Sequence, residues 1–143
     1  MTSHRDIAIV GGGFSGGMLL VQLIRQATSP LSITLINAGY PLIRGIAYST
    51  NDDSHLLNVR AGRMSAFPDD ALHFVKWIQA QQGVGYSEWQ TEDLPERFVP
   101  RSMYGAYLDD VLKEALSNVP AHVQVEVVQD EVTDLEQLEI GYR

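Results

Sequence analysis

The sequence predicts an α/β fold built on a parallel sheet, and three observations carry this prediction. Two short runs rich in apolar and β-branched residues, Asp6–Val10 and Leu31–Ile36, are typical of buried strands. Between them, glycines are followed by apolar residues at helical spacing from Met18 to Arg25. Strand, turn, helix and strand follow within about 32 residues, the size of one βαβ unit. The crossover of such a unit is expected to be right-handed.

Two more helices are predicted further along the chain. The first begins at Pro68, where two acidic residues suit the positive end of a helix, and runs to about Gln82. The second runs from Met103 to about Ser117, with Ser102 as its expected cap. Residues 40–68 show no clean periodicity but contain many apolar side chains, which predicts an ordered loop.

The C-terminal part completes the predicted sheet. Val123–Val128 is expected to be its third parallel strand, and Glu131–Leu135 and Leu138–Tyr142 are expected to start a small antiparallel excursion. Together these elements predict a Rossmann-like, three-layer α/β domain. Residues 1–143 are expected to form a single domain that is truncated at its C-terminus, because the last apolar run is unfinished.

Composition excludes several classes of protein. The chain has 143 residues and 45% hydrophobic residues, which suits one globular domain. Without cysteine it has no disulfides, zinc–thiolate site, iron–sulfur cluster or thiol nucleophile. No apolar run approaches the roughly 18 residues of a membrane span, and the N-terminus lacks a signal-peptide pattern. We therefore expect a cytoplasmic protein with no membrane partner and no metal site.

The net charge of −8 is unevenly distributed. Residues 1–68 carry +2 and residues 69–143 carry −10. An acidic chain without a basic stripe argues against a nucleic-acid partner. The first part keeps enough positive charge to receive a phosphate group.

A glycine turn provides the most specific chemical signal. Gly11, Gly13 and Gly16 form a GxGxxG pattern directly after the first strand and at the start of the first helix. The first glycine permits a tight turn, the second lets the backbone approach a pyrophosphate, and the third lets the helix pack closely on the strands. The helix start offers N–H groups and a positive dipole end to phosphates. Phe14 and Ser15 belong to the same predicted site, and the Ser15 hydroxyl is a further donor.

Asn37 ends the second strand, 21 residues after Gly16. In dinucleotide-binding folds an acidic residue at this place binds a ribose diol. An amide can also accept a hydroxyl hydrogen bond, but without the strength that charge gives a carboxylate. Asn37 is equally suited to the turn before Ala38 and Gly39. Both roles remain open from sequence.

Four blocks of sequence resemble one known family. They are Val10–Gly16, Arg44–Thr50 (RGIAYST), His55–Val59 (HLLNV) and Arg63–Asp70 (RMSAFPDD), and Phe98–Leu108 also fits. In this order they resemble the bacterial FAD/NAD(P)-binding protein family, which is related to flavin-dependent N-hydroxylating and Baeyer–Villiger-type monooxygenases. Members are usually several hundred residues long, so the resemblance implies an N-terminal fragment.

The resemblance implies FAD as the cofactor, NAD(P) as a further dinucleotide of the full-length protein, and a small-molecule substrate. It implies that Arg44 reaches the diphosphate or ribose as a forked donor. Asn58 either satisfies its loop or contacts the flavin. In related folds the backbone after the third strand touches the adenine, which points to Val132. An Asn at position 37 departs from the acidic residue of the family.

Other polar residues are weaker candidates. His55, Arg60 and Arg63 are expected to fix the loop, and Tyr104 and Tyr107 to pack in the core. Arg101 either holds the loop or faces a substrate. We see no nucleophilic triad and no metal-spaced cluster, which suits an enzyme whose cofactor carries the redox chemistry. The catalytic residues and the oligomeric state are not predicted.

Three functions follow from these features. The first is the FAD-binding part of an oxidoreductase that uses NAD(P)H or oxygen. The second is a non-catalytic nucleotide-binding or regulatory module with the same fold. The third places NAD(P) instead of FAD in the glycine turn.

Overall fold

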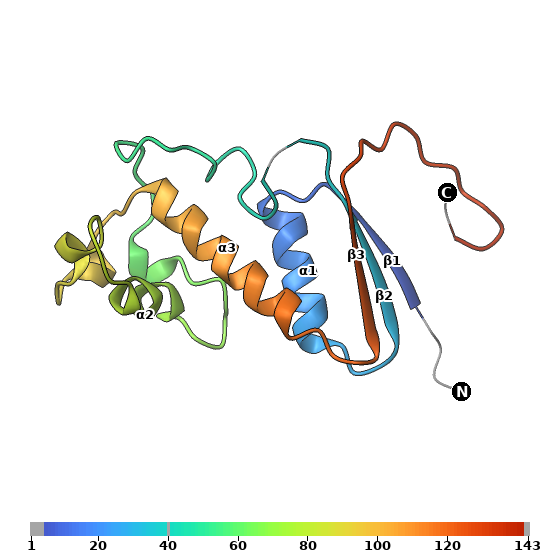
Figure 1. Cartoon of the computed structure of the whole chain (residues 1–143), viewed down its shortest axis with the longest axis horizontal. Coiled ribbons are helices and arrows are strands. Elements are labelled where there is room, and N and C mark those ends of the chain that lie inside the picture. The colour runs from blue at the N-terminus through green and yellow to red at the C-terminus, as the bar shows by residue number, and fades with distance from the viewer. Residues whose placement is uncertain (1–4, 40, 142–143) are drawn as a thin grey trace.

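A computed structural model of the chain describes residues 5–39 and 41–141. Its centre is a sheet of three parallel strands, β1 (Arg5–Val10), β2 (Leu31–Ile36) and β3 (Val123–Val128), with β2 in the middle (Figure 1). The strands pair over their whole length without a bulge, from Arg5 opposite Leu31 to Val10 opposite Ile36. The parallel α/β fold predicted from the sequence is therefore confirmed.

Two helices cover one face of this sheet. Helix α1 (Phe14–Gln26) connects β1 to β2, and α3 (Arg101–Ser117) precedes β3. Both lie on the same side of the sheet (Figure 1). Right-handed crossovers that step in the same direction along a sheet place their helices on the same face. The described residues thus form two of the three predicted layers, the sheet and the helices on one of its faces.

The core lies between this face and the helices. Alternate residues of β2, Leu31, Ile33 and Leu35, are buried, while the residues between them are half-buried. The α1 side chains Leu20, Val21 and Ile24 are buried against them. On the uncovered face, Val10 is 61% exposed. The sheet is thus packed on one side only within the described residues.

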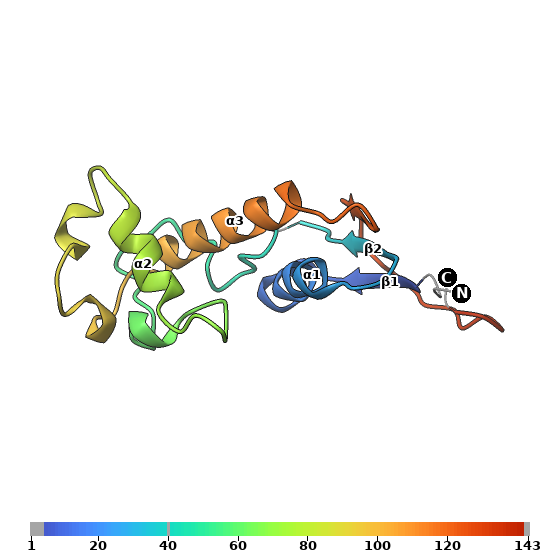
Figure 2. The same cartoon turned by 90° about the horizontal axis from the view of Figure 1, so that it is seen from below.

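Helix α2 (His73–Ala80) and the turns up to residue 100 form the end of the molecule farthest from the sheet (Figure 2). The predicted helix start at Pro68 is wrong, because residues 68–72 form turns before α2 begins. The predicted cap at Ser102 is also wrong. Helix α3 begins at Arg101, and the Ser102 hydroxyl donates a 2.6 Å hydrogen bond to Asp53.

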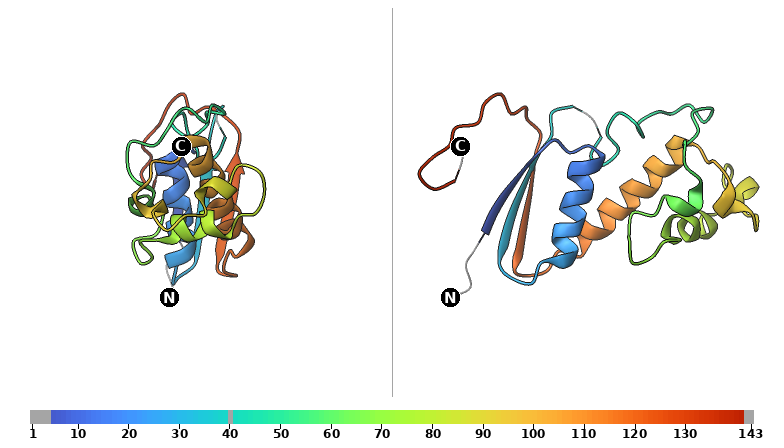
Figure 3. Two further views of the ribbon diagram at one scale, coloured as in Figure 1. Left: turned by 90° about the vertical axis from the view of Figure 1, so that its left-hand side faces the viewer. Right: turned by 180° about the vertical axis from the view of Figure 1, so that it is seen from behind.

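The segment after β3 leaves the carboxyl end of that strand and loops outward on the side of the sheet opposite the helices (Figure 3). No strand forms over the predicted range Glu131–Leu135, so that part of the antiparallel excursion is wrong for the described residues. The residues of this range are exposed, Leu135 to 63%, so they lack the burial that a strand at this place would give them. The last predicted run, Leu138–Tyr142, extends beyond the described residues. Among the described helices, none is long and apolar enough to cross a membrane.

Candidate functional site

The glycine turn links β1 to α1 at the carboxyl ends of the strands. Gly11 has a φ of +92°, which favours glycine, and its N–H donates to the Ile36 carbonyl at 2.8 Å. A Cβ atom at Gly16 would lie 1.8 Å from the Gly11 carbonyl oxygen. The structure therefore shows the tight turn at Gly11 and the close packing at Gly16 that the spacing predicts.

Gly13 differs from both of these glycines. It precedes α1 in an extended conformation, and a Cβ atom there would meet only the Gly45 Cα, at an ordinary 3.6 Å. Its missing side chain is thus not required by packing. Gly13 instead lines a cavity, where a side chain would take up space that a ligand needs.

This cavity, which we call the glycine cavity, has a volume of about 770 Å3. It lies at the carboxyl end of β1, which is where ligands bind in open α/β sheets. Arg44 is the charged member among its described lining residues. Seven of the predicted site residues line it: Gly11, Gly13, Phe14, Ser15, Gly16, Asn37 and Arg44.

Asn37 holds the glycine turn from the β2 side. Its side-chain Oδ1 accepts a 3.0 Å hydrogen bond from the Gly12 N–H. A Cβ atom at Gly12 would lie 3.0 Å from the Asn37 Cβ and 2.8 Å from the Leu42 Cδ2, so a larger residue would have to displace these side chains. Asn37 thus stabilises the glycine turn, whereas its roles in the turn before Ala38 and in ribose binding stay predictions.

A second, smaller cavity of about 400 Å3 adjoins Asn37 at the ends of β2 and β3. From β3 it is lined by Val127, Val128 and Gln129 rather than by Val132. The structure thus places other residues than Val132 beside Asn37 after the third strand. Asn37 lines both cavities.

The loop that follows β2 lies directly on the glycine turn. The Ile43 N–H donates to the Gly12 carbonyl at 2.6 Å, and a Cβ atom at Gly17 would lie 2.7 Å from Ile43. Ile43 has a φ of +66°, which is a strained conformation for a β-branched residue. Strain of this kind gathers at functional sites, held by surrounding structure. Gly45 completes the contact, because its Cβ would lie 3.3 Å from the Phe14 nitrogen.

Arg44 reaches from this loop to helix α3. Its Nε donates to the two carboxylate oxygens of Asp109 at 2.9 and 3.0 Å, and its Nη2 also donates to Asp109. Hydrogen bonding to this carboxylate raises the pKa of Arg44. No local pattern in the sequence points to Asp109, because 65 residues separate the two partners.

The other predicted residues lie away from the glycine cavity. Asn58 is exposed and Val132 is 36% exposed, and the cavity includes neither. Arg101 holds the preceding loop through its Nε, which donates to the Leu56 carbonyl at 3.1 Å. His55 hydrogen-bonds Thr50 in the same loop at 2.9 Å.

The two tyrosines of α3 pack in the core, as the sequence predicts. Tyr104 and Tyr107 are 2% and 0% exposed. Burial raises the pKa of both hydroxyls. The Tyr107 hydroxyl accepts the Ala66 N–H at 3.1 Å and lies 2.8 Å from His73 Nδ1. The Tyr104 ring contacts Tyr48 and Phe74. Both tyrosines of α3 therefore contact the loop after β2 as well as helix α2.

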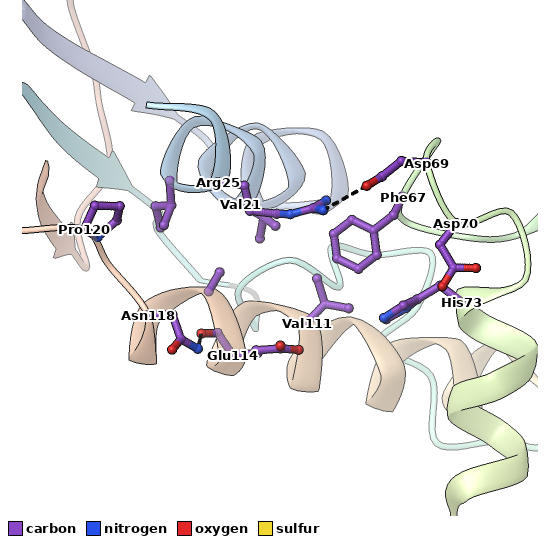
Figure 4. Close-up of a pocket in the computed structure, with 12 residues that line it drawn as sticks. Val21, Arg25, Phe67, Asp69, Asp70, His73, Val111, Glu114, Asn118 and Pro120 are labelled. Atoms are coloured by element: carbon purple, nitrogen blue, oxygen red, sulfur yellow. Dashed lines mark hydrogen bonds and ion pairs between the residues drawn. The ribbon is translucent and has the colours of Figure 1, made fainter. Parts of the chain in front are cut away.

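Figure 4 shows a different cavity of about 540 Å3 between α1, α3 and the turn before α2. Arg25 lies over the Phe67 ring at 4.1 Å and pairs with Asp69 at 3.4 Å. Asp70 and Glu114 add further negative charge to its rim. An acidic rim without the glycine turn does not suit a phosphate group, so the glycine cavity is the better candidate site.

Comparison with known proteins agrees with this geometry. Residues 8–143 match the FAD-NAD(P)-binding family. The chain belongs to this family. The match spans the glycine turn, the helices α1 and α3 that cover the sheet, and the segment beyond β3. The domain is therefore an FAD/NAD(P)-binding domain.

A curated relative of this FAD/NAD(P)-binding domain comes from a fungus. It is nitrosuccinic acid synthase npaA of Aspergillus oryzae, which is 26% identical over 136 residues. The alignment covers 88% of this chain but 21% of the relative. The chain thus spans about a fifth of the relative's length. A bacterial origin for this chain stays a prediction.

The residues present fit the cofactor of the family. A dinucleotide needs a backbone cradle for its phosphates, and an added Cβ at Gly13 would fill that cradle without meeting other atoms closely. The start of α1 supplies N–H groups and a positive dipole end beside it. Shape and chemistry therefore both suit a pyrophosphate.

Proposed function

We propose that this chain is the FAD-binding portion of a flavin-dependent oxidoreductase whose redox partner is NAD(P)H or oxygen. The observation that carries the proposal is the glycine cavity, where the GxGxxG turn, the start of α1 and Arg44 line one space. Membership of the FAD-NAD(P)-binding family supports it. FAD supplies the electron transfer, and the protein supplies binding and orientation.

Each residue of the cavity has a distinct part in the proposed binding. The backbone of Gly13, Ser15 and Gly16 receives the pyrophosphate, with Gly11 shaping the turn and Phe14 lining the space. Asn37 faces the adenosine ribose beside the second cavity. Arg44 adds positive charge near the phosphates. Asn58 and Val132 stay more distant candidates, for contacts with the flavin ring and the adenine.

The activity of the whole protein follows by analogy only. The relative is called nitrosuccinic acid synthase, and we propose that the parent of this chain also acts on a small molecule. The cytoplasm, which holds a pool of NAD(P)H, is the compartment we propose. The described residues present no group that we assign to substrate chemistry.

NAD(P) in the glycine cavity is the second candidate, and Asn37 favours it. A carboxylate at this position would repel a 2′-phosphate, whereas an amide does not. Titration of the chain with FAD, NAD⁺ and NADP⁺ by calorimetry distinguishes the two. Tighter binding of FAD supports the proposal. Tighter binding of NADP⁺ would favour NAD(P) as the ligand of the glycine cavity. Binding of simple adenosine nucleotides but of none of the three dinucleotides would favour a non-catalytic module.

A further inference from the structure

An ion pair between Arg44 and Asp109 connects the glycine cavity to helix α3. Arg44 lines the cavity and its guanidinium is bonded in bidentate fashion to Asp109, which lies on the cavity-distant side of the pair. The side chains are 23% and 45% exposed, so water competes with the contact only in part. Bidentate arginine–carboxylate contacts fix direction as well as energy.

The surroundings of Arg44 are also fixed, both in its own loop and on helix α3. Ile43 is held at a φ of +66° by its hydrogen bond to Gly12 and its packing on Gly17. On the α3 side, a Cβ atom at Gly105 would lie 2.4 Å from the Tyr48 carbonyl and 3.3 Å from the Arg44 Cδ. The aliphatic stem of Arg44 therefore passes over a glycine of α3 to reach Asp109, one helical turn further on.

From this geometry we propose that Asp109 is a positioning residue for phosphate binding in the glycine cavity. It rests on the proposed function, because it assumes that the cavity receives a dinucleotide. Asp109 uses donors on Nε and Nη2, and a guanidinium carries five donors, so Nη1 remains for a phosphate. A side chain that is already ordered loses less conformational freedom when the ligand binds.

Two effects of Asp109 oppose each other at the cavity. Its carboxylate orients Arg44, which favours phosphate binding, and its negative charge lowers the positive potential, which disfavours it. The proposal states that orientation outweighs charge. Removal of the carboxylate charge then weakens phosphate binding, whereas a purely electrostatic role would strengthen it.

The test uses ADP and adenosine as probes, which differ by the diphosphate. We expect Asp109→Asn to weaken ADP binding by about five- to tenfold and to leave adenosine binding unchanged. Asp110→Asn is the matched control, because it makes the same charge change one residue along α3. Asp110 accepts a 2.9 Å hydrogen bond from the Trp77 Nε1 instead of contacting Arg44. We expect this control to bind ADP within about twofold of the wild type.

Coupling to Arg44 is the second part of the test. Because Asp109 acts through Arg44, the Arg44→Met/Asp109→Asn double variant should bind ADP no more weakly than Arg44→Met alone. Asp109→Glu should recover most of the affinity. Thermal unfolding without ligand verifies that each variant is folded. If Asp109→Asn does not fold, the test is made with Asp109→Glu instead.

The outcomes separate this inference from the proposed function. If the wild type binds ADP no more tightly than adenosine, phosphate recognition fails and the proposed function fails with it. If the wild type prefers ADP but Asp109→Asn and Asp110→Asn bind ADP with equal affinity, only the positioning role of Asp109 is overturned. Tighter ADP binding by Asp109→Asn, or additive losses in the double variant, would overturn it too.

Discussion

Alanine at Gly16 and alanine at Gly13 should have opposite consequences, although the two glycines belong to one turn. At Gly16 the new Cβ would lie 1.8 Å from the Gly11 carbonyl oxygen and 3.2 Å from the Ile9 Cγ2. Both neighbours are fixed by the sheet, so α1 must move away from β1. At Gly13 the new Cβ would meet the Gly45 Cα at 3.6 Å, which is ordinary contact.

The magnitudes follow from these contacts. Overpacking in a fixed environment costs about 1–3 kcal/mol, and a clash with backbone belongs at the upper end. Alanine inside a helix regains about 1 kcal/mol relative to glycine. Gly16→Ala should therefore lower the free energy of unfolding by about 2 kcal/mol, or the Tm by roughly 6–8 °C for a chain of this length. Gly13→Ala should stay within about 1 kcal/mol of the wild type.

At Gly13, ligand binding should fall although stability is nearly unchanged. Gly13→Ala places a methyl group where the pyrophosphate lies, so ADP affinity should fall at least about tenfold, a loss of about 1.4 kcal/mol. Gly13→Val should abolish binding with only a modest loss of stability. Urea unfolding and ADP titration of the two alanine variants measure both quantities. The reasoning is refuted if Gly13→Ala loses as much stability as Gly16→Ala, or if it binds ADP like the wild type.

Three further predictions address other parts of the site. Asn37→Asp keeps an acceptor for the Gly12 N–H and adds charge, so it should strengthen FAD binding and weaken NADP⁺ binding; unchanged affinities would limit Asn37 to its turn role. Burial raises the pKa of Tyr104 in the folded chain, so the unfolded chain loses this proton first. The contribution of Tyr104 to stability should then be constant below about pH 10 and be lost as the pH rises above it. Between a pH below 10 and a pH above 10, the urea midpoint should fall less for Tyr104→Phe than for the wild type. An equal fall in both proteins would assign the loss of stability to other groups. Finally, the 143-residue chain should purify without FAD and without turnover, because the glycine cavity serves the adenosine and pyrophosphate end of the cofactor. Stoichiometric flavin that survives gel filtration, seen by its absorbance, would refute this.

Local patterns in the sequence were enough for the fold and the glycine turn. Periodicity identified β1, α1 and β2, and the spacing of Gly11, Gly13 and Gly16 identified the turn, because both depend on residues close in the chain. The predicted strand at Glu131–Leu135 is wrong because a strand also depends on a partner that is distant in the chain. Its alternating residues are suited to a strand, but the described chain offers them no partner.

The contacts that complete the site could not be read from the sequence. Asp109 lies 65 residues from Arg44, and Asn37 lies 25 residues from Gly12. Such pairs depend on how α3 and β2 are placed by the fold. The strained φ of Ile43 likewise has no signal in its residue type, because isoleucine disfavours that conformation. Gly12, Gly17 and Gly45 were visible as glycines, but only the packing shows why each is needed.

Binding of dinucleotide phosphates in the glycine cavity can be measured by the amide chemical shifts of the isotopically labelled chain during titration with ADP. We expect the largest shifts at Gly11, Gly13, Ser15 and Gly16, with smaller ones at Asn37 and Arg44. Gly13→Val should remove them. Shifts centred instead on Asp69, His73 and Glu114, around the cavity of Figure 4, would contradict the claim.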